Sequence, residues 1–228
     1  MKLLGIDTNA KTVKGEKLGY MTGILYLAPS DLSTYQVCAK ASAGCREACL
    51  YTAGRGAMSN VKKARIAKTR YFFEDRHAFM AQLVVEIKAL IKKARKAGMI
   101  PVVRLNGTSD IPWERVRVGD YPNIMAMFPE IQFYDYTKRA NRKNIPSNYH
   151  LTFSLAEDND ADAERALAFG LNVAVVFKGG LPETFMGAPV VNGDETDLRF
   201  LDEEGVVVGL KAKGKAKKDT SGFVRLAA

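Results

Sequence analysis

The three cysteines of the chain lie within one short stretch, residues 38–49. Cys38 and Cys45 are separated by six residues, and Cys45 and Cys49 by three. Most of the intervening residues are Ala, Ser or Gly, which allow a loop to wrap three thiolates around one centre. Three thiolates carry three negative charges, and an iron–sulfur cluster or a zinc ion is the usual partner for such a group. The spacing therefore predicts a metal centre in this loop.

Basic side chains close to the cysteines in the sequence would favour ionised thiolates: Lys40, Arg46 and Arg55. Two alternatives stay open, namely reduced and buried thiols that behave as small apolar side chains, and a disulfide with one spare thiol. Residues 1–7 contain no apolar run of the signal-peptide type, so we expect a reducing cytoplasm. In that compartment an odd number of cysteines favours metal or redox chemistry.

The fourth ligand distinguishes zinc from an iron–sulfur cluster. A structural zinc site needs four protein ligands, and the chain offers only His77 and His150 as nitrogen donors. His77 lies in a strongly helical stretch and His150 at the start of an expected strand, and neither has a second His or Cys at metal-binding spacing. A [4Fe-4S] cluster held by three cysteines leaves one iron open to a ligand or substrate. We therefore favour a [4Fe-4S] cluster over zinc.

Composition limits the class of protein. The 228 residues, 47% of them hydrophobic, suffice for the core of a single domain spanning residues 1–228. No apolar run approaches the roughly 20 residues of a membrane span, so no membrane partner is expected. The formal net charge of +9 indicates an anionic partner such as nucleic acid, a nucleotide or a phosphorylated substrate. Part of this charge lies in a basic C-terminal segment, about residues 211–218, whose five lysines favour a solvated tail.

Short apolar runs alternate with helical spacers along the chain. A helical pattern covers residues 60–97, with a break near residues 74–76 and Gly98 as its C-terminal signal, and a second spacer covers residues 160–169. This alternation is typical of a parallel sheet covered by helices. It predicts an α/β fold, as a full or partial (β/α) barrel, with the cysteine loop directly after the first barrel strand. The expected strands are residues 23–29, 100–106, 131–136, 151–155, 172–177, 189–191 and 206–210.

Polar and ionisable side chains follow these expected strands at their carboxyl ends, where parallel sheets and barrels place their active sites. The basic members would hold a carboxylate or phosphate, or donate to the anionic sulfurs of a cluster, and the acidic members would orient them or transfer protons. Asn, Asp and Ser also cap helices and begin turns, which is the alternative for those types. The candidate catalytic residues are Arg104, Asp110, Asp135, Lys138 and Lys178, and the candidate cofactor-binding residues are Asn106, Ser109 and Ser154.

The position of the cysteine loop resembles that in the radical S-adenosylmethionine superfamily, where three cysteines after the first barrel strand hold a [4Fe-4S] cluster. The resemblance implies that the open iron chelates the methionine part of S-adenosylmethionine. The spacing here, C-x6-C-x3-C, differs from the usual C-x3-C-x2-C of that superfamily. Our leading hypothesis is an iron–sulfur enzyme of this architecture, in which the open iron binds S-adenosylmethionine, or else a small anionic ligand such as sulfide.

A closer match covers most of the chain. It is carried by residues 45–51, 54–56, 104–114, 133–138 and 209–214. Together these segments resemble the phage-encoded gene product 88 family. The resemblance implies a viral protein, and it makes the cytoplasm of an infected bacterium the expected location.

A protein of another class is the alternative: a non-enzymatic nucleic-acid-binding protein in which a cluster or zinc only staples the fold. The net charge of +9, the basic stretch of residues 62–70 and the C-terminal lysines favour it. Tyr51 and Trp113 would then serve as stacking aromatics. No recognised nucleic-acid-binding motif is present, which favours the enzyme hypothesis.

Overall fold

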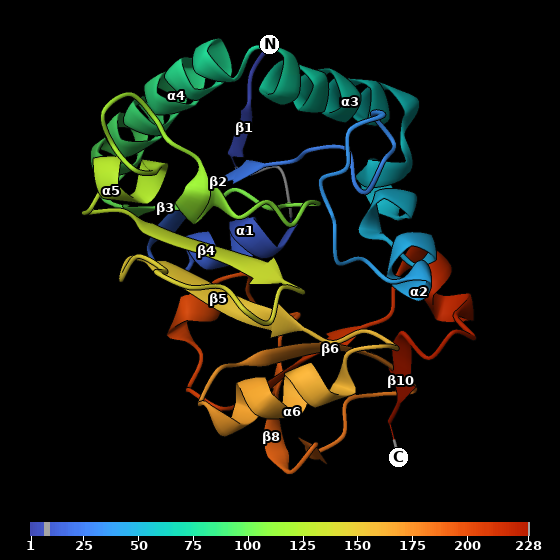
Figure 1. Cartoon of the computed structure of the whole chain (residues 1–228). Helices are drawn as coiled ribbons and strands as arrows, with labels where there is room; N and C mark the ends of the chain where they lie inside the picture. The colour runs from blue at the N-terminus through green and yellow to red at the C-terminus, as the bar shows by residue number, and fades with distance from the viewer. Residues whose placement is uncertain (7–9, 228) are drawn as a thin grey trace.

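The computed structural model, which describes residues 1–6 and 10–227, is built around one mixed β-sheet (Figure 1). The order of its hydrogen-bonded strands is β1-β2-β3-β4-β5-β6-β9-β8-β7, and β10 adds to β6. The strands are β1 (Leu4–Ile6), β2 (Tyr20–Leu25), β3 (Ile100–Arg104), β4 (Gln132–Thr137), β5 (Tyr149–Ser154), β6 (Val173–Lys178), β7 (Thr184–Phe185), β8 (Ala188–Asn192), β9 (Val207–Lys211) and β10 (Val224–Leu226).

Seven neighbouring strands, from β2 to β8 along this order, are parallel. The predicted α/β class is confirmed, and each predicted apolar run contains an observed strand, with ends shifted by a few residues. The predicted parallel sheet carries an antiparallel strand at each of its two edges, because β1 and β7 pair antiparallel with their neighbours. Among the described residues, no pairing joins the two edges, so the sheet is not closed there and the structure does not confirm the predicted barrel.

Two long helices occupy the connection between β2 and β3, where the sequence predicts one interrupted helix. The predicted break is confirmed, since Asp75 separates them with non-helical backbone (φ −141°, ψ 73°) and its side chain accepts a hydrogen bond from Ala78 N. Gly98 ends the second helix with a left-handed φ of +66°, which only glycine adopts readily. The helices are α1 (Ala10–Glu16), α2 (Ala43–Glu47), α3 (Ser59–Glu74), α4 (Arg76–Lys96), α5 (Ile124–Met127) and α6 (Asp160–Ala168), with short 3-10 turns η1 (Leu50–Thr52), η2 (Gly54–Ala57), η3 (Trp113–Arg115), η4 (Arg199–Leu201) and η5 (Gly214–Lys218).

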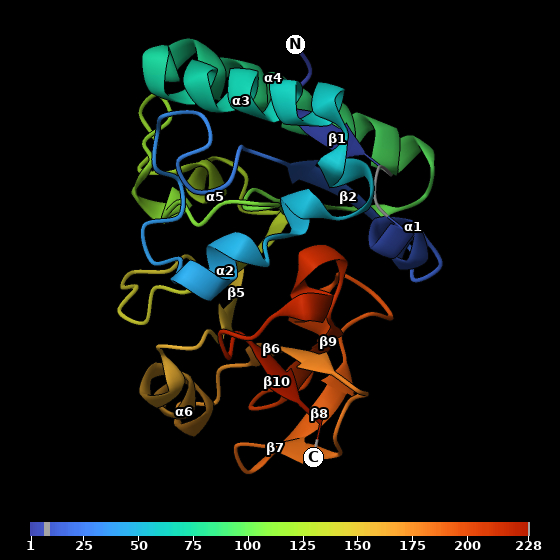
Figure 2. The same ribbon diagram turned by 90° about the vertical axis from the view of Figure 1, so that its right-hand side faces the viewer.

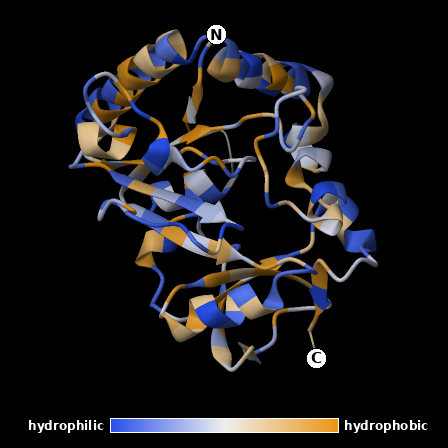
Figure 3. Ribbon diagram, viewed as in Figure 1, coloured by the Kyte–Doolittle hydropathy of each residue, from blue (hydrophilic) through white to orange (hydrophobic). Residues whose placement is uncertain are grey.

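The helices cover the sheet and supply its core. In both views α3 and α4 lie above β1 and β2, and α6 lies toward the opposite end of the molecule (Figures 1 and 2). The buried residues of α4 recur every three or four positions, which gives one apolar face. That face joins the largest hydrophobic cluster, with residues from β1 to β5. In Figure 3 the hydrophobic colour is strongest on β1, β2 and β6, whereas β4 is mostly pale or blue.

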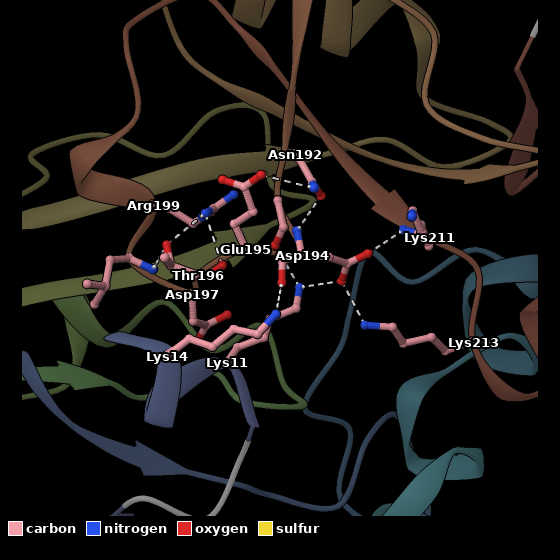
Figure 4. A network of polar contacts seen from close by, with 12 residues as sticks. Lys11, Lys14, Asn192, Asp194, Glu195, Thr196, Asp197, Arg199, Lys211 and Lys213 are labelled. Atoms are coloured by element: carbon pink, nitrogen blue, oxygen red, sulfur yellow. Dashed lines mark hydrogen bonds and ion pairs between the residues drawn. The ribbon is translucent and has the colours of Figure 1, made fainter. Parts of the chain in front are cut away.

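Side chains of α1 connect one side of the open sheet to the segment after β8 (Figure 4). Lys11 Nζ donates to Gly193 O at 2.8 Å and pairs with the Asp194 carboxylate at 3.0 Å. Lys14 Nζ donates to Asp194 O at 3.1 Å. Asp194 also accepts from Lys211 N and Lys213 Nζ, at 2.9 and 2.7 Å. Polar side chains thus connect α1 to the segment after β8, which strand pairing does not join.

The basic segment at residues 211–218 is not a tail, which corrects the expectation. It forms the end of β9 and the turn η5, after which the chain returns to pair β10 with β6. Its lysine side chains are exposed, while Ala216 between them is buried and fixes the backbone. No helix in the described part of the chain has the length and apolar character needed to cross a membrane.

Candidate metal centre

The three cysteines line a single small cavity of about 100 Å³ in the long loop that follows β2. All three thiols are free and partly buried. Holding one water molecule takes about 10–15 Å³ of such space, so the cavity exceeds the need of a single ion. Cys38 Sγ accepts from Ser30 N at 3.4 Å, and the backbone N–H of Tyr51 bonds to the Cys49 thiol. Backbone N–H groups aimed at sulfur are what an iron–sulfur site uses to stabilise its anionic thiolates.

Burial controls the ionisation of these thiols. It raises the pKa of Cys38 to about 12, and the neighbouring Cys49 and Cys45 contribute in the same direction. Burial also raises the pKa of Cys49, against the opposing effect of Arg65 and Lys138. The expectation that Lys40, Arg46 and Arg55 produce ionised thiolates is therefore wrong for these two cysteines. Loss of water around the sulfur outweighs the nearby positive charge.

Arg65, on α3, supplies the positive charge next to the cysteines, and the sequence analysis did not single it out. Its guanidinium lies over the Tyr26 ring at 4.9 Å. Nε and Nη1 are buried and have no hydrogen-bond partner among the described residues. Burial lowers the pKa of Arg65, while Tyr26 and Cys49 raise it. Buried donors without acceptors are costly, so this guanidinium is suited to an anionic group in the adjacent cavity.

Contacts with distant loops hold the cysteine loop in place. Ser42, the N-cap of α2, donates to Glu157 Oε2 at 2.6 Å, and Gly44 N donates to Glu157 Oε1 at 2.7 Å. A Cβ at Gly44 would lie 2.1 Å from Ser221 Oγ, so the close approach requires glycine there. No local pattern identifies Glu157, because it acts on residues 113 and 115 positions away.

Three of the predicted site residues lie together beside the cysteine cavity. The Asp110 carboxylate accepts from Thr137 Oγ1 at 2.8 Å and from Lys138 N at 3.0 Å. Lys138 Nζ donates to Ser154 Oγ at 2.7 Å, and the charge of Lys138 acts on Cys49. Asp110 therefore positions the segment that carries Lys138 next to the cysteines. This grouping agrees with the predicted clustering at the carboxyl ends of the strands.

Asn106, Ser109 and Asp135 form a buried network that shapes the loop after β3. Asn106 Oδ1 accepts from Ser109 Oγ at 2.8 Å, and from Ile111 N and Trp113 Nε1 at 3.0 Å each. Asp135 accepts from Asn106 N at 2.7 Å and from Tyr149 Oη at 2.8 Å. Burial raises the pKa of Asp135 to about 7. The observed hydrogen bonds of Asn106 and Ser109 are all with other residues of the protein, and these bonds hold the loop after β3 in position.

Arg104 and Lys178 lie outside the cysteine cavity. Arg104 is buried and its Nη1 contacts both carboxylate oxygens of Asp197, at 3.0 and 2.8 Å. Burial by itself lowers the pKa of Arg104, but Asp197 holds it above its ordinary value. Lys178 ends β6 with an exposed side chain. The sequence did not reveal Asp197, which comes from the connection between β8 and β9.

The structure also shows where the two histidines and Trp113 lie. His77 is exposed on α4, and His150 on β5 lies 3.4 Å from Thr152 Oγ1, so neither lines the cysteine cavity. Trp113 is fully buried and cannot serve as a stacking surface, which corrects that expectation. In the described part of the chain, no three or more His, Cys, Asp or Glu side chains are arranged around a single metal ion. A cluster requires a wider spacing, because each thiolate binds a different iron.

Fold and site together define an open-sheet α/β protein with a three-cysteine cavity in the loop after its first parallel strand. The family model described as gene product 88 matches residues 2–227. The chain therefore belongs to the gene product 88 family, a family of phage gene products. The comparison with curated proteins gave no match, and neither did the comparison with solved structures.

Proposed function

We propose that this protein binds a [4Fe-4S] cluster through Cys38, Cys45 and Cys49, with one iron left open. The observation that carries the proposal is the shared cavity of the three thiols beside Arg65, whose buried Nε and Nη1 have no acceptor among the described residues. The sulfides and thiolates of a cluster would provide those acceptors. When bound, such a cluster would supply one-electron chemistry and an open coordination position.

We further propose an enzyme that resembles the radical S-adenosylmethionine superfamily. Support comes from the strand order, in which β2 to β6 are neighbours in sequence order, as in a partial barrel. The cysteine loop follows the first of these parallel strands. We place its action in the cytoplasm of an infected bacterium, where reducing conditions keep thiols available for iron.

The roles of the chain's own residues follow from their contacts. Lys138, held by Asp110 and bonded to Ser154, would attract the carboxylate of S-adenosylmethionine, or a simple anion, to the open iron. Arg65 would stabilise the negative charge of the cluster. Glu157 keeps the loop between Cys38 and Cys45 folded against the loop after β5.

The metal content of protein purified without oxygen tests the proposal. We expect a brown protein with about four irons and four sulfides per chain. Cys45→Ser should lose the cluster and part of the stability, because metal binding is coupled to folding. Ala39→Ser, an exposed change in the same loop, is the matched control and should retain both. Stoichiometric zinc without sulfide would reject the cluster, and unchanged iron in all three Cys→Ser variants would reject the site.

The supporting residues give a second test. Glu157→Ala should weaken the loop, so that iron is lost faster to a chelator, whereas Glu164→Ala at an exposed position of α6 should behave as wild type. His77→Gln and His150→Gln should leave the spectrum unchanged, while added S-adenosylmethionine, sulfide or cyanide should alter it. Lys138→Met should weaken that response. A spectrum that ignores every ligand and collapses in one histidine variant would show a filled fourth site and exclude the enzyme.

A further inference from the structure

A larger cavity of about 380 Å³ adjoins the cysteine loop. It lies between the loop after β4, the turn η3 and the beginning of α6, and Lys40 of the cysteine loop also lines it. Cys38 and Ala41, which flank residues 39–40, line the cysteine cavity, so the same short segment contributes to both spaces. Its volume falls within the roughly 300–1,000 Å³ that small-molecule sites occupy. We name it the 138–142 pocket after the loop that forms most of it.

The lining of the 138–142 pocket is predominantly basic. Its charged residues are Lys40, Arg115, Lys138, Arg139 and Arg142 on the basic side, and Glu114, Asp158 and Asp162 on the acidic side. Glu114 pairs with Arg142, and Arg115 Nε is 4.0 Å from the same carboxylate. Asp162 pairs with Arg165, which lies outside the pocket. When the Arg142–Glu114 and Arg165–Asp162 pairs are left out of the count, the lining of the pocket retains four basic side chains and one acidic side chain, that of Asp158.

Arg142 gives a second, independent indication of a ligand. Its side chain is only 5% exposed and lines the pocket. Nε donates to Glu114 Oε1 at 3.2 Å and Nη2 bonds to Oε2, but Nη1 is buried without a partner among the described residues. Buried guanidinium nitrogens normally have an acceptor. An anionic group in the pocket would lie beside this positively charged guanidinium.

We propose that the 138–142 pocket binds a phosphate-bearing small molecule. Three of its basic residues are arginines, whose planar donors match phosphate oxygens better than lysine does. The net positive charge of the pocket is larger than a ligand with a single carboxylate would balance. A hollow of this size suits a compact ligand, whereas a nucleic acid strand needs a groove that follows its backbone. The inference is independent of the cluster, although the position of Lys138 between the two cavities would bring such a ligand close to the cysteines.

The test is calorimetric titration of the full chain, purified anaerobically, with inorganic pyrophosphate, with iron content measured before and after. Arg115→Met and Arg139→Met should each weaken binding by about tenfold or more, since each removes charged hydrogen bonds. Asp158→Asn should strengthen binding, because it removes a repelling charge. Lys88→Met and Arg95→Met remove exposed charges on α4 and should leave the affinity unchanged. The Arg115 side chain is 65% exposed, so its replacement should not unfold the protein.

Other outcomes would overturn the proposal. Absence of pyrophosphate binding would do so, and so would equal losses in the α4 variants, which would indicate general attraction to a basic protein. Binding of a short single-stranded oligonucleotide that depends on Arg115 and Arg139, without pyrophosphate binding, would assign the surface to nucleic acid instead. Pyrophosphate binding with the expected variant pattern in protein that lacks iron would support the pocket and reject the cluster. Iron and sulfide without pyrophosphate binding would do the reverse.

Discussion

Desolvation determines the ionisation of several side chains in this protein. Cys38, Cys49 and Asp135 each have cationic or hydrogen-bonding neighbours, yet the pKa of each is raised, with burial as the largest cause. Water stabilises a charged group more than a few fixed dipoles do, so burial favours the neutral form of an acid or thiol. For Asp135 this places the pKa near 7, inside the range where folding stability can be measured against pH.

Asp135 should make the protein less stable as the pH rises. In the unfolded chain its pKa is about 3.9, so between about pH 4 and 7 only the folded state keeps the proton. The free energy of unfolding should therefore fall by about 2–3 kcal/mol more in wild type than in Asp135→Asn between pH 5 and 7.5. Urea unfolding at the two pH values measures this difference.

The matched control for Asp135 is Asp120→Asn, which alters an exposed carboxylate and should retain the wild-type dependence. The Asp135→Asn variant can keep a hydrogen bond to Tyr149, because the Tyr149 hydroxyl can change from donor to acceptor. If Asp135→Asn kept the full wild-type dependence on pH, Asp135 would be charged in the folded state across this range.

At the scale of secondary-structure elements, a single capping residue divides the helical pattern of residues 60–97 into the two helices α3 and α4. Both helices have good helix-forming composition, and the interruption is a single residue, Asp75. Its carboxylate accepts from Ala78 N at 3.0 Å and thereby satisfies one of the free N–H groups that begin α4. The cap thus begins α4, whose apolar face is buried.

Loss of this cap should be measurable. We expect Asp75→Ala to lower the free energy of unfolding by about 1 kcal/mol, because the N–H of Ala78 loses its acceptor. Asp75→Asn keeps an acceptor oxygen and should cost much less. Urea denaturation of the two variants beside wild type gives the comparison. Equal stability of the Ala and Asn variants would mean that the cap contributes nothing.

At the scale of the whole molecule, charged side chains connect segments that are far apart in the sequence and are not paired with each other in the sheet. Arg104, at the end of β3, pairs with Asp197 from the β8–β9 connection, 93 residues away. Tyr134 Oη also lies 3.4 Å from Asp197 Oδ2. Together with the Lys11–Asp194 contact shown in Figure 4, this pair ties the first and last parts of the sheet together. The Arg104 predicted as a ligand-binding group is thus in contact with a protein carboxylate.

Breaking the Arg104–Asp197 pair should be strongly destabilising. Asp197→Ala leaves a buried guanidinium without its counter-charge and should lower the free energy of unfolding by about 3–5 kcal/mol. Replacing both partners with apolar residues, as in Arg104→Met with Asp197→Leu, should recover most of that loss. Thermal or urea unfolding of Arg104→Met, Asp197→Leu and the double variant completes the double-mutant cycle, with Asp197→Ala measured beside them. A double variant as unstable as Asp197→Ala would argue against a buried ion pair as the cause.

The sequence alone determined the features that depend on neighbouring residues. The gathering of Cys38, Cys45 and Cys49 around one cavity follows from their short separation, and the break at Asp75 follows from a capping residue within a helical pattern. The strands from β2 to β6 are evident as apolar runs bounded by turn-forming residues. The short elements β1, α1, β7 and β10 escaped prediction, because two to seven residues carry too little periodicity to distinguish a strand from a loop.

Only the tertiary structure decided which side chains serve these features. Glu157 meets the cysteine loop across 115 residues, Asp197 meets Arg104 across 93, and Arg65 approaches Cys49 from a helix. Such contacts depend on how loops and helices pack, and no spacing in the sequence encodes them. The same holds for ionisation, since the number of water molecules that a thiol or carboxylate loses is set by everything packed around it. For that reason the grouping of the three cysteines was predictable from sequence, and the residues that support their loop were not.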